Sequence, residues 1–219
     1  MAIIGVLALQ GGFAAHALAL NALGHQVREV RAPGDLQGLE GIVLPGGESS
    51  VQLMLLASSG LEAPLGEALR AGLPALGTCA GLILLAKEVH TGPARPSQRS
   101  FGLLDVRVAR NAWGRQLESF EARSERGRPL LFIRAPRIEA VGPGVEVLDR
   151  FRGEPIVVRA GSIIGACFHP ELVKEAPGAL HAELFGAPRP RREPAEASAP
   201  RPAGQGRDVA GTPVIRGAR

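Results

Sequence analysis

The chain has 219 residues, 45% of them hydrophobic and 21% charged, and its formal net charge is +4. This length and composition are those of a globular protein with one sizeable core, which excludes a miniprotein held together by disulfide bonds. Its two cysteines, Cys79 and Cys167, show no metal-ligand spacing, so neither a zinc site nor a disulfide is predicted.

The basic excess lies in residues 187–219. Seven arginines stand there against three acidic residues, whereas residues 1–186 hold 18 residues of each sign. The same segment contains six of the 18 prolines, no aromatic residue and no periodic pattern, which predicts a disordered basic tail after a neutral body. A high isoelectric point often indicates a nucleic-acid partner. Here the neutral body and the lack of aromatic residues in the tail argue against one.

No run of 18 apolar residues occurs, and the first residues, MAIIGVLALQGG, lack the basic start and the cleavage site of a signal peptide. The sequence therefore predicts neither a membrane span nor export. We expect a cytoplasmic protein whose thiols stay reduced.

In the first 90 residues, short apolar runs alternate with helical patterns. Strands are predicted at 3–9, 26–30, 41–44 and 73–78, and helices at 13–23, 50–57, 61–71 and 80–88. This alternation predicts an α/β fold with an open, mostly parallel sheet that is flanked by helices on both faces.

After residue 90 the pattern becomes β-rich. Short segments bounded by Gly, Pro or charged turns lie at 103–110, 117–122, 130–135, 138–142, 145–151, 155–160 and 162–168. We predict that they form antiparallel hairpins joined to the same sheet, which makes that sheet mixed. One last helix is expected over residues 176–185, which closes a single domain at residues 1–186.

The strongest local motif is LPALGTCAGLILLAKEV at 73–89, where an apolar strand runs through Gly-Thr-Cys-Ala-Gly into a helix. This is the G-x-nucleophile-x-G elbow with Cys79 as the nucleophile, because small flanking residues permit a strained turn that lifts the side chain out of the sheet. The N–H groups that begin the helix favour negative charge on the sulfur. The alternative is a buried cysteine in a glycine-rich turn, but strand, spacing and helix together favour the nucleophile.

A cysteine nucleophile needs a base and a group that orients the base. His169 directly follows the apolar segment SIIGACF, and Glu171 stands two residues later, at a strand end where the catalytic groups of α/β sheets gather. These two residues are therefore the candidate base and its partner. The remaining histidines are expected at the surface or in helix caps: His16, His25, His90 and His181.

A third motif is GIVLPGGESS at 41–50, a strand that ends in Pro-Gly-Gly. Gly46 and Gly47 lack a Cβ and can present backbone N–H groups to an oxyanion. Taken alone, the segment is better explained as a tight turn in which Ser49 or Ser50 caps the next helix. Cys167 has no elbow and is predicted to pack in the core.

In this order and spacing, PGGES at 45–49, GTCAG at 77–81 and FHPE at 168–171 resemble the class I, or triad, glutamine amidotransferases. The segments ALQGGFAAH (8–16), FGLLDVRVARNAWGRQLESFEA (101–122) and FIRAP (132–136) resemble those of one family in particular, the glutaminase subunits of pyridoxal 5′-phosphate synthase, known as PdxT or Sno. The resemblance covers roughly residues 2–186. It implies a flavodoxin-like domain that hydrolyses L-glutamine to L-glutamate and ammonia.

The resemblance also implies roles for particular residues. Cys79 is the nucleophile that forms a γ-glutamyl thioester, His169 is the base and acid, and Glu171 orients it. Gly47 and Ala80 supply the oxyanion hole. The residues implied to bind L-glutamine are Gly46, Gly47, Glu48, Arg110, Ile133 and Arg134.

The resemblance also implies a protein partner, but it implies neither a cofactor nor a metal ion. The chain shows no nucleotide-binding motif and no second domain of synthase size, so its ammonia is expected to pass to a separate synthase subunit, a (β/α)8 barrel. The docking face is expected around Gln10–Gly11 and Gly46–Gly47. Two alternatives stay open: a glutaminase subunit that serves another acceptor, and a basic-tailed nucleic-acid or regulatory protein with a vestigial triad.

Overall fold

The structure is a computed structural model that describes residues 2–92, 97–113, 119–176 and 178–186. The predicted tail at residues 187–219 lies outside the described residues, so that prediction and the domain boundary before it remain predictions. Within the described ranges, no helix is long and apolar enough to cross a membrane.

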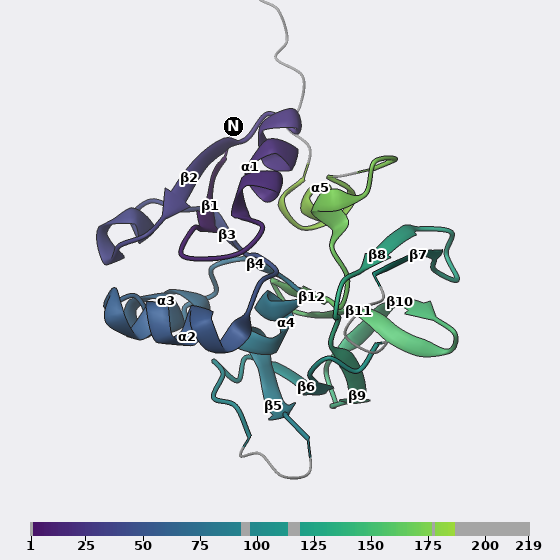
Figure 1. The fold of residues 1–219 in the computed structure, drawn as a ribbon. Helices are drawn as coiled ribbons and strands as arrows, with labels where there is room; N and C mark the ends of the chain where they lie inside the picture. Colours follow the sequence, from purple (N-terminus) through teal and green to yellow (C-terminus); the bar gives the residue numbers. More distant parts are fainter. Residues whose placement is uncertain (1, 93–96, 114–118, 177, 187–219) are drawn as a thin grey trace, which may run out of the picture. The chain divides into compact units, whose positions relative to one another are not determined.

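A seven-stranded sheet forms the centre of the fold, in the order β10-β11-β12-β4-β3-β1-β2 (Figure 1). Neighbours among β1, β2, β3, β4 and β12 pair in parallel, while β10 and β11 add an antiparallel edge, so the sheet is mixed as predicted. Every residue of β3, β4 and β12 is buried, which explains why these strands are almost uniformly apolar. The strands are β1 (Ile3–Leu7), β2 (Gln26–Val30), β3 (Gly41–Leu44), β4 (Ala75–Thr78), β10 (Glu146–Phe151), β11 (Glu154–Ala160) and β12 (Ile163–Ala166).

Helices cover both faces of this sheet (Figure 1). From β1 to β2 the chain moves along the sheet in one direction, through α1, and from β3 to β4 it moves in the other, through α2 and α3. Because both crossovers are right-handed, the two connections lie on opposite faces. The helices are α1 (Phe13–Ala22), α2 (Ser49–Ser58), α3 (Glu62–Arg70), α4 (Ala80–Leu85) and α5 (Ala179–Phe185), with short 3-10 turns η1 (Pro33–Leu36) and η2 (Pro170–Leu172).

The helix predicted over residues 80–88 is wrong in its second half. The helix α4 ends at Leu85, and the strand β5 (Ala86–His90) begins at the next residue and pairs with β6 (Leu104–Ala109). All six residues of α4 are buried, whereas β5 has exposed residues between its buried Ala86 and Val89. The segment AKEV suits a helix by composition, and only its pairing with β6 makes it a strand.

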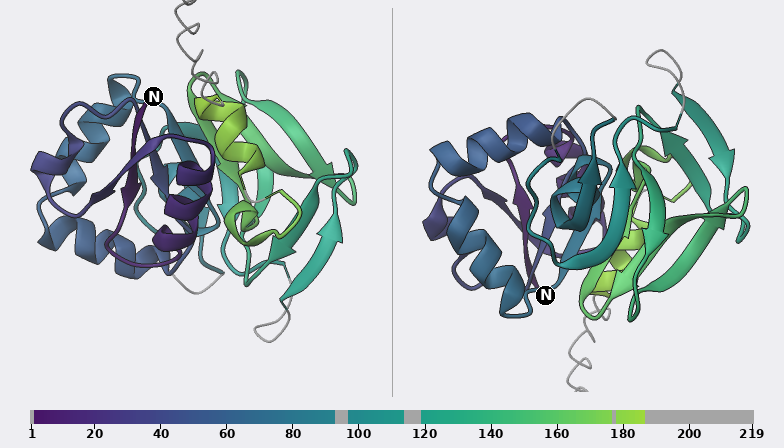
Figure 2. Two further views of the ribbon diagram at one scale, coloured as in Figure 1. Left: turned by 90° about the horizontal axis from the view of Figure 1, so that it is seen from above. Right: turned by 90° about the horizontal axis from the view of Figure 1, so that it is seen from below.

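We predicted that the hairpins after residue 90 join the main sheet. Only some of them do, so that prediction is partly wrong. The strands β10 and β11 do join it, but β5, β6 and β9 (Arg137–Val141) form a separate three-stranded sheet, and β7 (Phe120–Arg123) and β8 (Pro129–Phe132) form a hairpin of their own. Figure 2 shows these teal and green strands gathered on the side of the molecule away from α2 and α3. Alternation of polar and apolar residues identifies a strand but not its partner.

Aromatic side chains fix the hairpin β7–β8 to the rest of the second half. Phe120 and Phe132 stack with ring centroids 4.8 Å apart, and Phe132 also meets Phe151 at 5.6 Å and Phe168 at 6.1 Å. This cluster therefore connects β8 to β10 and to the segment that follows β12, and it holds the residues after Phe132 at the edge of the main sheet.

Candidate active site

Four parallel strands end at one edge of the main sheet and deliver the candidate residues to it. The strand β1 is followed by Gln10, β3 by Pro45–Glu48, β4 by Cys79 and β12 by His169. The chain leaves β1 toward β2 on one side and leaves the neighbouring β3 toward β4 on the other, and such a switch point is where open α/β sheets bind ligands.

The predicted strand-to-helix elbow is present at Cys79, between β4 and α4. Its backbone angles are φ 48° and ψ −102°, a conformation that costs a non-glycine residue energy. The flanking glycines are required by close packing: a Cβ on Gly81 would lie 1.9 Å from the carbonyl oxygen of Leu44, and one on Gly77 would lie 2.7 Å from the backbone of Gly81. The turn leaves Cys79 6% exposed at the sheet edge.

An imidazole and a carboxylate stand behind this thiol. Cys79 and His169 line the same cavity, and His169 Nδ1 lies 2.7 Å from Glu171 Oε1. The backbone N–H of His169 donates to the carbonyl of Leu131 at 3.0 Å, which anchors the residue to β8. Thiol, imidazole and carboxylate therefore follow one another in the order that nucleophilic catalysis requires.

Burial and charge oppose each other in this group. Burial disfavours a charged imidazole, yet hydrogen bonds to Cys79 and Glu171 raise the pKa of His169 above its ordinary value. Burial likewise disfavours the carboxylate, but His16 and His169 beside it keep the pKa of Glu171 below its ordinary value. The site thus favours a protonated His169 beside a charged Glu171.

A cavity of about 100 Å³ opens in front of Cys79 and His169. Of the residues predicted to bind a substrate, five line it, while Gly46 and Ala80 do not. Three further lining residues were not predicted, and only Asn111 could have been found from the sequence, because it follows Arg110 directly. The lining residues are Gly47, Glu48, Ser49, Cys79, Ile83, Arg110, Asn111, Ile133, Arg134 and His169.

The cavity carries both signs of charge. The Arg110 guanidinium is paired with the Glu48 carboxylate and also donates to Gln98 Oε1 at 2.7 Å. The predicted strand 130–135 ends early, at Phe132, and Arg134, which also lines the cavity, lies beyond its end with φ 45°. The carbonyl oxygen of Ile133 lies 4.0 Å from Cys79 Sγ.

The Pro-Gly-Gly-Glu turn is held against the base. A Cβ on Gly46 would lie 2.3 Å from His169 Cε1, so only glycine fits beneath the imidazole. Of the four residues at the expected docking face, Gly11 and Gly47 are exposed, Gln10 is half-buried and Gly46 is buried. The Glu48 N–H donates to Gln10 Oε1 at 2.9 Å, so the turns after β1 and β3 are joined.

Two histidines expected at the surface are instead buried behind the site. His16 and His181 are both 0% exposed. His16 Nε2 lies 3.3 Å from Glu171 Oε2 and 3.1 Å from Thr78 Oγ1, and its Nδ1 lies 2.8 Å from His181 Nε2. The prediction was wrong because the helical pattern does not identify which face of α1 and α5 meets the core. His90 is exposed as expected, and His25 is buried with its Nε2 2.8 Å from the carbonyl of Gly186.

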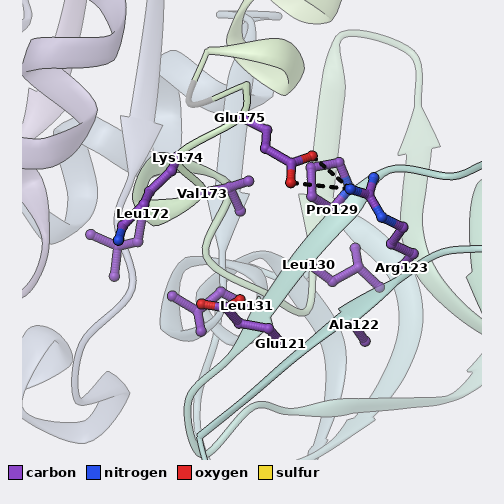
Figure 3. Close-up of a pocket in the computed structure, with 10 residues that line it drawn as sticks. All are labelled: Glu121, Ala122, Arg123, Pro129, Leu130, Leu131, Leu172, Val173, Lys174 and Glu175. Atoms are coloured by element: carbon purple, nitrogen blue, oxygen red, sulfur yellow. Dashed lines mark hydrogen bonds and ion pairs between the residues drawn. The ribbon is translucent and has the colours of Figure 1, made fainter.

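A larger hollow lies elsewhere, between the hairpin β7–β8 and the segment after η2 (Figure 3). Its volume is about 450 Å³, and its ion pair joins Arg123 to Glu175 at 2.8 Å. The side chains that line it include neither a thiol nor an imidazole. The smaller cavity at Cys79 is therefore the candidate active site.

Known proteins resemble this chain over most of its length. A sequence profile of the SNO glutamine amidotransferase family matches residues 6–181. Pyridoxal 5′-phosphate synthase subunit PdxT from Koribacter versatilis is 51% identical over 177 residues, which are 77% of this chain and 88% of that protein. The same subunit from Deinococcus radiodurans is 46% identical over 189 residues, which are 84% and 95%. A crystal structure of a glutamine amidotransferase is 43% identical, has a TM-score of 0.75 and covers 84% of this chain and 98% of its own.

Proposed function

This chain belongs to the SNO glutamine amidotransferase family and is a glutaminase subunit of pyridoxal 5′-phosphate biosynthesis, and we propose that Cys79, His169 and Glu171 carry out its reaction. The observation that supports the triad is that the strained Cys79 elbow and His169 line one cavity, with His169 Nδ1 2.7 Å from a buried Glu171. The family agrees with the one that the sequence motifs predicted.

The first half of the reaction forms a covalent intermediate. The sulfur of Cys79 attacks the side-chain amide carbon of L-glutamine while His169 holds the proton of the thiol. The amide oxygen becomes an oxyanion, for which we assign the N–H groups of Gly47 and Ala80 as donors. The Ala80 N–H suits this role because, as the first residue of α4, it has no acceptor within its own helix.

The second half releases the products. The tetrahedral intermediate collapses when His169 returns its proton to the leaving nitrogen, which departs as ammonia and leaves a γ-glutamyl thioester on Cys79. A water molecule then gives one proton to His169 and adds to the thioester carbon. Cleavage of the carbon–sulfur bond and return of that proton to the sulfur yield L-glutamate and the free thiol.

The charged walls of the cavity suit a free amino acid. L-Glutamine carries an α-carboxylate and an α-ammonium, and the cavity offers the guanidinium groups of Arg110 and Arg134 together with the Glu48 carboxylate. Ile133 and the backbone of Gly47 complete its walls. Gly46 contributes to binding only indirectly, by letting His169 approach.

Ammonia released into water would be lost, so a synthase partner has to receive it. We assign that partner the form of a (β/α)8 barrel, and we place its docking face at the exposed Gly11 and Gly47 beside the nucleophile edge. Thiols stay reduced in the cytosol, and for that reason we place the reaction in the cytoplasm.

The decisive experiment compares the two cysteines. Glutamate release is measured with the synthase subunit present for the unaltered chain, for Cys79→Ala and for Cys167→Ala. Cys167 is the matched control because it is fully buried, where burial raises the pKa of its thiol far above the ordinary value. We expect Cys79→Ala to lose activity and Cys167→Ala to keep it. Full activity in Cys79→Ala would overturn the proposed triad.

A further inference from the structure

We propose that His16 is a positioning residue of the triad, one that holds the Glu171 carboxylate by the oxygen that His169 does not use. This inference rests on the proposed function, since it gives a role to a side chain that touches Glu171 and not the substrate.

The carboxylate of Glu171 has two unlike oxygens. Oε1 lies 2.7 Å from His169 Nδ1. Oε2 is buried and makes no hydrogen bond of good geometry to any described residue, and His16 Nε2 lies 3.3 Å from it. Both side chains are 0% exposed, so bulk water does not reach this contact. A buried carboxylate oxygen without a donor is costly, and the His16 ring is the group placed to supply one.

His16 also connects the carboxylate to the nucleophile elbow. Its Nε2 lies 3.1 Å from Thr78 Oγ1, and Thr78 directly precedes Cys79. The same hydroxyl accepts a hydrogen bond from the Gly46 N–H at 3.1 Å. The His16 imidazole on α1 therefore contacts two parts of the site: Thr78, which directly precedes Cys79, and Glu171 in the η2 turn. Through the Thr78 hydroxyl it is also connected to Gly46.

The charge state of His16 follows from its surroundings. Burial lowers the pKa of His16 to about 4, against the attraction of Glu171, and burial lowers the pKa of His181 to about 3. The ionisable groups that face His16 are Glu171 on η2, His169 after β12 and His181 on α5, with His25 beyond His181. Both imidazoles are therefore neutral at pH 7 and carry one N–H each.

The hydrogen-bond partners then select the tautomers. A carboxylate only accepts, so the proton of His16 belongs on Nε2, and its Nδ1 accepts from the Nε2–H of His181. The opposite assignment would direct a lone pair of His16 at the carboxylate. It would also leave the Nδ1–H of His181 buried without an acceptor, because that atom has no partner among the described residues. His181 thus fixes the tautomer that places the N–H of His16 toward Glu171.

The test uses three substitutions in the complex with the synthase subunit. His16→Leu removes the donor, His16→Gln keeps an N–H near the position of Nε2, and His25→Leu removes a buried histidine that bonds Gly186 instead of the triad. We expect His16→Leu to lower kcat for glutamine hydrolysis about 10- to 100-fold with KM changed less than threefold. His16→Gln is expected to restore most of kcat, and His25→Leu to leave it unchanged.

A second readout separates positioning from a general loss of stability. The hydrogen bond to Glu171 raises the pKa of His169, so a loosened carboxylate moves the titration of His169, followed by NMR, to lower pH in His16→Leu but not in His25→Leu. Should His16→Leu fail to fold, His16→Asn takes its place, because its amide stands near the position of Nδ1 and does not reach Glu171.

The outcomes are distinguishable from those of the cysteine experiment. An unchanged kcat and an unchanged His169 titration in a folded His16→Leu protein, beside an inactive Cys79→Ala protein, overturn the role of His16 and leave the triad intact. An active Cys79→Ala protein overturns the triad itself.

Discussion

In the proposed mechanism, Glu171 acts on the reaction through the orientation and charge of His169. Its carboxylate accepts from His169 Nδ1, which leaves the other ring nitrogen to exchange a proton with Cys79. The carboxyl stays charged although it is 6% exposed, because His16 and His169 lie against it. The role of Glu171 therefore depends on its charge as well as on its shape.

Replacing that charge tests the role directly. We expect Glu171→Gln, which keeps the shape of the side chain, to lower kcat about 10²- to 10⁴-fold, because the imidazolium formed during the reaction loses its counter-charge. Glu175→Gln is the matched control, since Glu175 is an exposed partner of Arg123. Steady-state kinetics with the synthase subunit measures both variants. Equal kcat values for the two would argue against any role for Glu171 in the chemistry.

At the scale of elements, the junction between β4 and α4 determines where the thiol stands. Gly77 and Gly81 allow the helix to turn back tightly against the strands, and Cys79 between them takes a positive φ. The elbow was predictable because the strand, the Gly-x-Cys-x-Gly spacing and the helix that identify it follow one another within residues 73–89. The end of α4 was not predictable, because β5 forms only through pairing with β6, which lies after the loop.

The packing of this junction gives a prediction about stability. We expect Gly81→Ala to lower the free energy of unfolding by about 3 kcal/mol or more, since its Cβ would lie 1.9 Å from the backbone oxygen of Leu44, which has no room to move. Gly34→Ala is the control, because a Cβ there meets nothing within 4 Å. Urea denaturation measures both. Equal stability of the two variants would show that the elbow has more room than the structure indicates.

At the scale of the whole molecule, the buried histidines make stability depend on pH. The pKa of His16 is lowered from 6.5 to about 4, and that of His181 from 6.5 to about 3. Between these values and pH 6.5 the unfolded chain binds more protons than the folded one, so stability falls as the pH falls. His169 does not add to this, because its raised pKa means that the folded chain, and not the unfolded one, holds the extra proton at this residue.

We therefore expect the free energy of unfolding to decrease from pH 6 to pH 4.5, by up to about 1.4 kcal/mol per pH unit for each of the two histidines. His181→Gln, which keeps a donor for His16 but does not titrate, should roughly halve that slope. Urea titrations at several pH values measure the slope. The same slope in both proteins would mean that His181 is not held neutral in the folded state.

The sequence alone determined the family, the α/β class and the triad candidates. Strand-end motifs are local: Cys79 is recognised from its neighbours, and His169 and Glu171 from the strand that precedes them. Apolar runs alternating with helical patterns likewise predict parallel strands, because a buried strand must be apolar along its whole length. The comparisons with known proteins agree with the family that those motifs indicated.

Only the tertiary structure decided how distant segments meet. His16 and His181 stand 165 positions apart, and only the packing of α1 beside α5 brings their rings within 2.8 Å. The partners of β5, β6 and β9 and the separate hairpin β7–β8 depend in the same way on contacts across the chain. The periodic pattern of a sequence shows which residues can be buried, but only the fold determines which residues they contact. The proposed role of His16 depends on such contacts, with Glu171, Thr78 and His181.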